Sequence, residues 1–227
     1  MNEVDSIYNK RIDSIHFDDE PVDMFAQIPS YLIESAKNPS KESGLITPFN
    51  QYNKFFGGLK KGDGTYVFCA RLGEGKSVWL YNLSKGVASI NRKKVLYLDT
   101  EMSLKMNMDR ASAAQTKTNP WYFQNGQWNK NTEIAEKVMG AIEEFKKLNG
   151  LFYYKYVPNK SIKEIISIAR KWKLKYVGRD EDCLVVLDYL KMVGNSEAER
   201  NEWQAFGDSI SYLNEFGAAY NATTAAG

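Results

Sequence analysis

The sequence has few of the residues that build metal centres and disulfide scaffolds. Two cysteines and one histidine occur among its 227 residues. Cys69 and Cys183 lie far apart, and neither forms a C-x-x-C pair or a metal-type cluster with His16. We therefore expect no disulfide and no metal site of cysteine or histidine, and we predict that both thiols are buried and reduced. His16, beside the acidic residues 18–20, is predicted to lie on the surface.

Long apolar runs and a large charge excess are also absent. The longest apolar runs, such as Leu184–Leu187, are far shorter than the roughly 20 residues that span a bilayer, and no basic-then-apolar leader is recognisable. The 30 basic and 28 acidic residues leave a formal net charge of +2, so any contact with DNA is expected to be local. These absences predict a cytoplasmic protein with no membrane partner.

The composition is that of an ordinary globular protein, with 43% apolar and 26% charged residues, so one main domain is expected. We expect an N-terminal arm or linker over residues 1–43 and the main domain over 44–227. Apolar residues of the arm recur at helical spacing, but Pro29 interrupts the pattern and predicts one or two short helices. These apolar residues are Met24, Phe25, Ile28, Leu32 and Ile33.

From Leu45 onward, β-rich apolar runs alternate with helical patterns, which is typical of an α/β protein with a mostly parallel sheet and helices on both faces. The predicted strands are Thr65–Ala70, Val95–Asp99, Leu151–Val157, Leu184–Asp188 and Ala218–Thr224. The predicted helices are Leu80–Ile90, Thr132–Leu148, Ile162–Trp172 and Glu199–Phe216. The aromatic segment Thr116–Asn129 is predicted to form an irregular packed loop, with a base-stacking surface as the alternative.

The stretch FCARLGEGKSVW stands between a predicted strand and a predicted amphipathic helix. A phosphate-binding loop needs this order, because backbone N–H groups and the start of the helix face the anion. Gly73 and Gly75 allow close backbone approach. Lys76 is placed to reach terminal phosphates, and the Ser77 hydroxyl can bind magnesium. A chance match in a surface turn is the alternative, and the flanking strand and helix argue against it.

Two further apolar strands end in acidic residues. CLVVLDYL brings Asp188 to a strand end, and VLYLDTEMS brings Asp99 and Glu101 to another. Ligands of open parallel sheets bind at the carboxyl ends of the strands, so Asp188 is predicted to complete a magnesium site, directly or through water. Turn capping is its alternative role. Glu101 is predicted to activate the attacking water, with Asp99 as the rival.

In their order and spacing these motifs resemble the ATPase domain of the DnaB family of replicative DNA helicases, from about Gly44 to the end. TPFNQYNKFFGGLKKGD is similar to that family's lead-in, and LDTEMS and VVLDYLKM resemble its glutamate segment and its I-D-Y-L-Q box. ARLGEGKS matches its A-R-P-x-M-G-K-T loop, which accounts for Ala70, where the usual pattern has glycine, together with Arg71. Leu72 and Glu74 replace the family's proline and methionine, and neither change removes a phosphate ligand.

The resemblance implies a RecA-like P-loop NTPase that uses ATP and Mg²⁺. It implies that Lys76 and Glu101 are catalytic and that Ser77 and Asp188 hold the metal. The implied nucleotide-binding residues are Ala70, Arg71, Leu72, Gly73, Glu74, Gly75, Lys76, Ser77 and Arg110.

The resemblance also implies partners. Members of the family form a ring of six subunits around single-stranded DNA, so a homo-hexamer and a primase or helicase loader are expected. The DNA-binding loops would begin near Lys191 and include Arg200; solvated surface charge is the equal alternative for both residues.

The end of the chain departs from the family pattern. Gly227 comes before the positions of the family's sensor glutamine, second DNA-binding loop and arginine finger. An arginine finger typically contributes about 10³ to 10⁵ in rate, so we expect weak or absent ATPase activity and a fragment or truncated reading frame.

The lack of a recognisable helical N-terminal domain indicates a phage-type relative, located in the host cytoplasm if it is phage-encoded. The alternatives are a RecA-like ATP-binding regulator or helicase-loading accessory and, more weakly, a strand-exchange recombinase.

Overall fold

The computed structural model describes residues 23–37, 44–61, 64–71, 73–190 and 202–227. The chain divides into two compact units, Met1–Lys41 and Glu42–Gly227. Among the described residues, no helix is long and apolar enough to cross a membrane. His16 lies outside the described residues.

The first unit contains one described helix, α2 (Met24–Lys37), which continues through Pro29. The Asp23 carboxylate accepts a hydrogen bond from the Ala26 N–H at 3.1 Å and so supports the start of the helix. A helix is present where we predicted one or two, but Pro29 does not interrupt it. Proline removes one backbone donor, and because Phe25 and its neighbours are exposed, water can satisfy the carbonyl that loses its partner.

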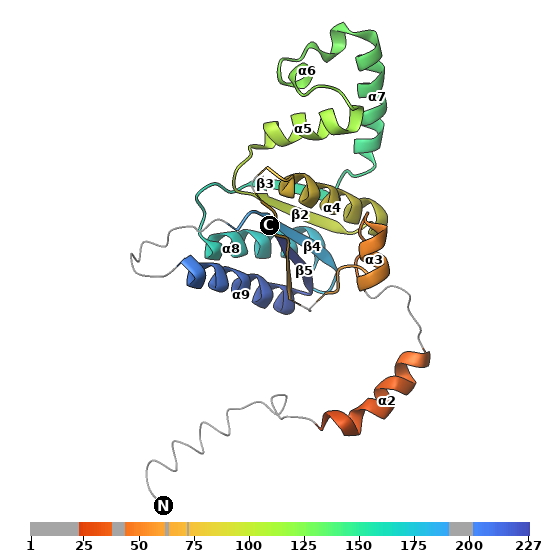
Figure 1. Cartoon of the computed structure of the whole chain (residues 1–227), viewed down its shortest axis with the longest axis vertical. Helices are drawn as coiled ribbons and strands as arrows, with labels where there is room; N and C mark the ends of the chain where they lie inside the picture. The colour runs from red at the N-terminus through yellow and green to blue at the C-terminus, as the bar shows by residue number, and fades with distance from the viewer. Residues whose placement is uncertain (1–22, 38–43, 62–63, 72, 191–201) are drawn as a thin grey trace, which may run out of the picture. The chain divides into compact units, whose positions relative to one another are not determined.

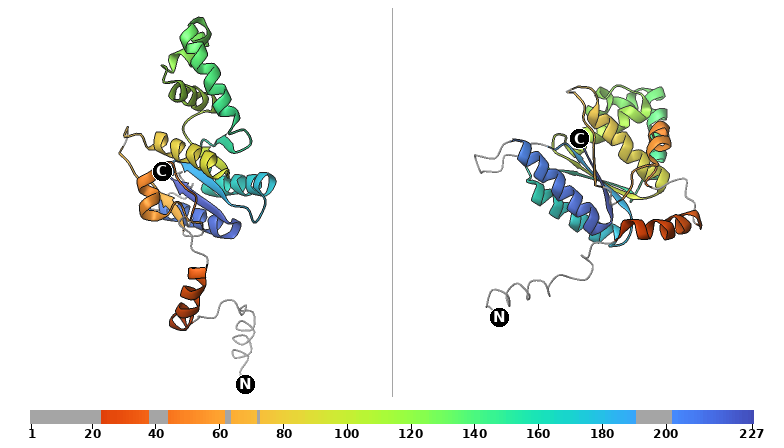
Figure 2. Two further views of the ribbon diagram at one scale, coloured as in Figure 1. Left: turned by 90° about the vertical axis from the view of Figure 1, so that its right-hand side faces the viewer. Right: turned by 60° about the horizontal axis from the view of Figure 1, so that its bottom comes forward.

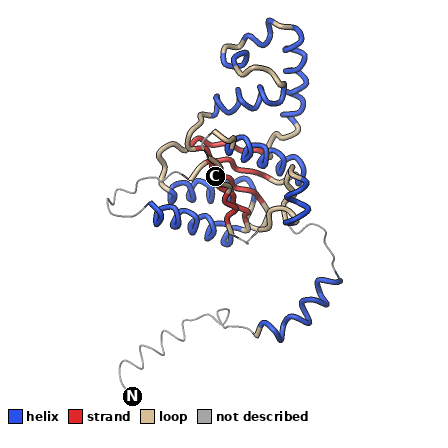
Figure 3. Tube along the Cα trace, viewed as in Figure 1, coloured by secondary structure: helices blue, strands red, loops and turns tan. Residues whose placement is uncertain are grey.

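The second unit is built on a five-stranded sheet in the order β1-β5-β4-β2-β3 (Figures 1 and 3). All neighbouring strands are parallel, which confirms the predicted α/β class. The strands are β1 (Thr65–Val67), β2 (Lys94–Asp99), β3 (Phe152–Tyr156), β4 (Cys183–Asp188) and β5 (Ala222–Ala226). The central position belongs to β4, the strand that ends in Asp188.

Helices cover both faces of this sheet (Figure 1). On one face, α4 (Lys76–Asn91) packs against β2 and β4, and α3 (Asn50–Phe56) adds Tyr52 to the same apolar cluster. On the other face lie α8 (Ile162–Trp172), followed by the π-helical turn η3 (Lys173–Val177), and α9 (Glu202–Tyr220). Strands and helices alternate along the chain, and this alternation produces the layered fold.

Side chains of the central strands alternate between the two faces, as a pleated strand requires. Val95 and Tyr97 of β2 belong to the cluster under α4, whereas Leu96 and Leu98 belong to the cluster under α8 and α9. The same alternation assigns Asp99, at the end of β2, to the α4 face. We call this side of the sheet the α4 face.

Four helical segments between β2 and β3 form a separate group, which we call the helical lobe (Figure 2). They are α5 (Leu104–Thr116), α6 (Trp121–Gln124), the 3₁₀ turn η2 (Gln127–Lys130) and α7 (Thr132–Lys146). Within the lobe, α5 contacts α6 and α7, and η2 contacts α6 and α7. The predicted irregular loop at Thr116–Asn129 therefore contains two short helical segments, and Trp121 packs edge-on against Tyr122.

The last strand lies further along the chain than Ala218–Thr224, the range that we predicted. Helix α9 continues to Tyr220, and β5 begins at Ala222. Alanine favours helices, so Ala218 and Ala219 extend α9 instead of starting the strand. Asn221, with φ of 50°, makes the turn between them. Residues 199–201 of the predicted helix lie outside the described residues.

Candidate nucleotide-binding site

The predicted phosphate loop connects β1 to α4. Gly73 and Gly75 have φ of 84° and 86°, a left-handed conformation that side chains disfavour, and Gly75 is the residue that precedes the first turn of α4. A Cβ at either glycine would meet nothing within 4 Å, so open space lies in front of the loop backbone. The Glu74 N–H donates to the Arg71 carbonyl at 3.1 Å and closes the turn. Leu72 lies outside the described residues.

A cavity of about 320 Å³ lies beside the loop, within the size range of small-molecule sites. Its walls combine loop residues with an aromatic side. The lining residues are Val67, Phe68, Cys69, Ala70, Glu74, Gly75, Lys76 and Trp79. The Trp79 ring contacts the Phe68 ring at a centroid distance of 4.1 Å and stacks on the Phe49 ring at 4.8 Å. Cys69 is exposed, so the prediction that it is buried is wrong: β1 ends at Val67, before the cysteine.

Lys76 is the first residue of α4, and its ammonium group lies 4.1 Å from the centroid of the Tyr189 ring. This distance is in the range of a cation–π contact. The pKa of Tyr189 is raised, first by burial and then by the charge of Glu101, to which the Tyr189 hydroxyl donates. Tyr189 therefore joins the loop lysine to the glutamate predicted to act on water.

Asp188 ends the central strand on the α4 face. Its Oδ2 accepts a hydrogen bond from the Tyr97 hydroxyl at 2.6 Å. Among the described residues, its Oδ1 is buried and has no hydrogen-bond partner. Burial raises the pKa of Asp188, while the Tyr97 and Ser77 hydroxyls lower it. A buried, unpartnered carboxylate oxygen near a hydroxyl fits a hard divalent cation, because Mg²⁺ prefers oxygen ligands and keeps several waters.

Asp99 is engaged by backbone and side-chain donors. Its Oδ1 accepts from the N–H groups of Glu101 at 2.8 Å and Met102 at 2.7 Å. Its Oδ2 accepts from the Asn107 side chain at 2.8 Å, and the residue is only 2% exposed. Glu101, in contrast, is exposed. This geometry gives Asp99 a structural task and favours Glu101 as the residue that meets water.

The structure does not bring every predicted residue to the loop. Arg110 lies exposed on α5, and within the described part of the chain no hydrogen bond or ion pair joins it to the phosphate loop. Lys191 and Arg200 lie outside the described residues.

Sequence reasoning also missed several neighbours of the predicted acids. Tyr97, Asn107, Tyr154 and Tyr189 all contact a predicted site residue or its supporting loop. For Tyr97 a signal existed, because it lies two residues before Asp99 and so shares its face of the strand.

A parallel sheet with a glycine-rich loop that leads into a helix, and with an acid at the end of the central strand, defines a P-loop NTPase of RecA-like fold. Residues 44–215 match the family model of the DnaB-like helicase C terminal domain, and the chain belongs to this family.

Solved structures share the fold. A DnaB-like replicative helicase, studied with its interactions with primase, is 19% identical with a TM-score of 0.76, over 98% of this chain and 51% of that one. A second solved structure, an ATPase domain, is 18% identical with a TM-score of 0.74, over 91% of this chain and 71% of that one. The chain thus spans about half the length of the first of these relatives. No curated protein sequence matches it.

Proposed function

We propose that residues 44–227 form an ATP-binding motor core that uses Mg²⁺, preceded by an arm over residues 1–43. The observation that carries the proposal is the convergence of Lys76, Ser77 and Asp188, because a loop cation, a hydroxyl and a buried unpartnered carboxylate are what a metal–triphosphate ligand requires. Membership of the DnaB-like family supports the same conclusion.

Each predicted residue has a role in this proposal. The backbone N–H groups of Gly73 to Ser77 would donate to phosphate oxygens, and Lys76 would pair with the terminal phosphates. Ser77 and Asp188 would hold Mg²⁺, which neutralises phosphate charge when bound. Glu101 would take the proton of the attacking water. The loop would be completed by Ala70, Arg71, Leu72 and Glu74. Arg110 would contact the nucleotide from α5.

For the whole protein we propose a replicative DNA helicase, in which ATP hydrolysis drives translocation on single-stranded DNA and duplex unwinding. The family match supports this function over the ATP-binding regulator and the recombinase. A homo-hexamer, a primase or loader partner and a cytoplasmic location belong to the same proposal. The phage-type relationship remains a prediction from the sequence.

Calorimetry with ATP and Mg²⁺ tests the site directly. Lys76→Ala removes a charged partner of the phosphates and is expected to weaken binding by about 10- to 100-fold, since hydrogen bonds to charged groups contribute roughly 1.5–3 kcal/mol. The control is Lys105→Ala, because Lys105 is an exposed lysine of α5. Equal binding by Lys76→Ala and the unaltered protein would contradict the assignment.

A further inference from the structure

The loop that carries Glu101 is held by a closed set of hydrogen bonds. Asp99 fixes the backbone on one side, since its Oδ1 accepts from the N–H groups of Glu101 and Met102 at 2.8 and 2.7 Å. On the other side, the Tyr154 hydroxyl of β3 donates to the Met102 carbonyl. The peptide groups that flank Glu101 are therefore tied to β2 and β3, whereas its side chain stays exposed.

Asn107 joins these two attachments to the helical lobe. Its side-chain amide donates to Asp99 Oδ2 at 2.8 Å and to the Tyr154 hydroxyl at 2.9 Å. Both amide hydrogens are thus used, and the residue is only 8% exposed. Burial, followed by the charge of Asp99, raises the pKa of Tyr154, which keeps its hydroxyl protonated as a donor. We call Asp99, Asn107 and Tyr154 the Asp99 clamp.

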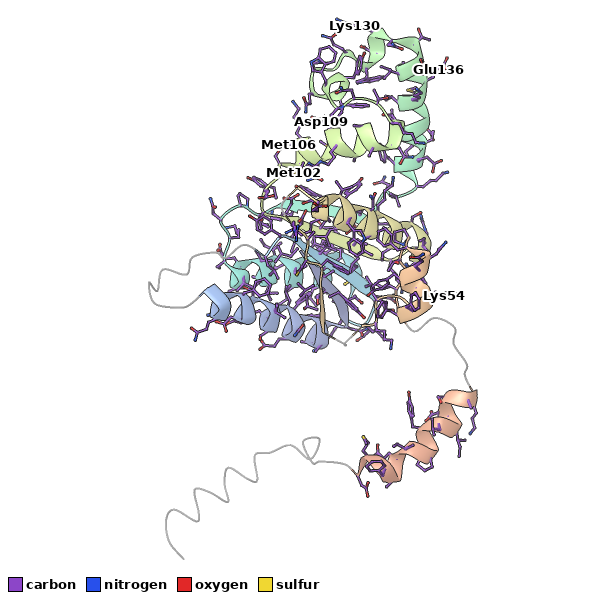
Figure 4. All side chains as sticks on the ribbon, viewed as in Figure 1. Lys54, Met102, Met106, Asp109, Lys130 and Glu136 are labelled. Carbon is purple, nitrogen blue, oxygen red and sulfur yellow. The ribbon has the colours of Figure 1, made fainter. Side chains whose placement is uncertain are left out.

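The clamp is not needed to stabilise the N-terminus of α5. Ser103 caps this helix, because its hydroxyl accepts from the Met106 N–H at 3.3 Å. Asn107 lies one turn further along α5 and points its amide to the sheet edge. Figure 4 shows the path from this edge to the lobe, along the labelled residues Met102, Met106 and Asp109.

We propose that the Asp99 clamp positions Glu101 for its action on water, and that Asn107 couples this position to α5 and thus to the helical lobe. The inference rests on the proposed ATPase function and adds to it: Asp99, Asn107 and Tyr154 are positioning residues that act through Glu101. A displacement of α5 would change the geometry of Glu101 without touching the phosphate loop.

Two measurements on the full chain test the clamp. Hydrogen exchange without nucleotide reports on the Glu101 and Met102 N–H groups, which are expected to exchange faster in Asn107→Ala. Single-turnover hydrolysis of bound ATP is expected to slow by about tenfold or more in the same variant, because small misplacements of a catalytic group cost up to about 10² in rate. ATP affinity is expected to remain unchanged, since Lys76 and Ser77 are not altered. The control variant Lys105→Ala, on the same helix, should change neither the hydrogen exchange of these N–H groups nor the rate of hydrolysis.

An exchange of the carboxylate and the amide between positions 99 and 107 distinguishes a positioning role from a loss of folding. Asn107→Asp alone places a second carboxylate beside Asp99 and is expected to slow hydrolysis through like-charge repulsion. Adding Asp99→Asn restores one amide–carboxylate hydrogen bond between the two positions, so the double variant should recover most of the lost rate. Thermal unfolding of each variant identifies any that fail to fold.

The outcomes distinguish the two proposals. The clamp proposal is overturned if Asn107→Ala leaves the exchange of the Glu101 and Met102 N–H groups unchanged, or if Asn107→Ala and Asn107→Asp hydrolyse bound ATP at the rate of the unaltered protein. It is also overturned if the double variant folds but recovers no activity. Absence of ATP binding to the unaltered protein would instead overturn the proposed function, whatever hydrogen exchange shows for the loop.

Discussion

At the scale of single residues, the contact between Tyr97 and Asp188 favours the charged form of the carboxylate at the candidate metal site. The Tyr97 hydroxyl donates to the carboxylate, and this bond lowers the pKa of Asp188 against the stronger effect of burial, which raises it. Because the net pKa is raised, the folded protein binds a proton at a pH where the unfolded chain has lost it. The free energy of unfolding therefore falls as the pH rises from the unfolded pKa of Asp188 through its folded pKa. Over the same range Asp188 loses its proton and becomes able to bind a cation.

Tyr97→Phe is expected to raise the pKa of Asp188 further, because it removes a donor to the charged form. Magnesium-dependent ATP binding should then decline at a higher pH than in the unaltered protein as the solution is acidified. Calorimetry over a series of pH values measures the shift. Tyr153→Phe is the matched control, since Tyr153 packs on the opposite face of the sheet. Identical pH profiles for Tyr97→Phe and the unaltered protein would refute a tuning role.

The residues of the site differ in how far the sequence could predict them. Gly73, Gly75 and Lys76 lie in one short motif, so their proximity follows from chain connectivity. The pairing of Tyr97 with Asp188 depends on strand register, in which Asp99 lies opposite Asp188. Register is set by packing of the whole sheet, and no local pattern in either strand reveals it.

At the scale of elements, helix α8 begins with a capping box. The Ser161 hydroxyl accepts from the Glu164 N–H at 3.4 Å, and Glu164 Oε2 accepts from the Ser161 N–H at 3.0 Å. Hydrogen bonds from Lys160, and then from Ser161, lower the pKa of Glu164 to about 2. The carboxylate therefore contributes stability above its unfolded pKa of about 4.5, and this contribution is lost as pH falls towards 2.

Ser161→Ala is expected to lower the free energy of unfolding by about 1 kcal/mol, because it leaves the Glu164 N–H in the first turn of α8 without its acceptor. Urea denaturation measures the change. Ser167→Ala is the control on the same helix, where an exposed interior serine is replaced by a better helix former. A larger loss in Ser167→Ala than in Ser161→Ala would show that the cap is not the source of the effect.

The turn after α8 contains a buried lysine. Lys173 is fully buried, and its ammonium group donates to the Gly178 carbonyl at 2.8 Å and to the Glu181 carbonyl. Lys173→Met keeps an unbranched side chain, shorter by one atom, but leaves both carbonyls without this donor. We expect a loss of about 1–3 kcal/mol in urea denaturation, and little change for the exposed Lys171→Met. Equal stability of the two variants would contradict a structural role for Lys173.

The elements also show where sequence patterns fail. The bounds predicted for α8 match the structure, because its apolar stripe and its cap agree. Helix α5 was not predicted, since it buries only Asn107, Ala113 and Thr116 and so has almost no apolar stripe. Its contacts with the sheet edge include the hydrogen bonds of Asn107, which apolar periodicity does not detect.

At the scale of the whole molecule, the sheet separates two apolar clusters that have different roles. The cluster under α8 and α9 stabilises the sheet from the side that carries no predicted site residue. The cluster under α4 supports the strand ends from which Asp99 and Asp188 project. The α/β class followed from the sequence, because alternating strands and helices admit few other architectures. The order of the strands and the grouping of the helical lobe did not, because they depend on contacts between distant segments.

The alternation of side chains along β2 and β4 limits how this protein can change in length. Tyr97, Asp99 and Asp188 share a face because, within each strand, every second residue points to the same side of the sheet as the buried Val95 and Val186. One residue inserted within either strand would move every side chain beyond it to the opposite face, so that Asp99 or Asp188 would lie under α8 and α9. We therefore expect insertions and deletions to be tolerated in the connections between the strands and not within β2 or β4.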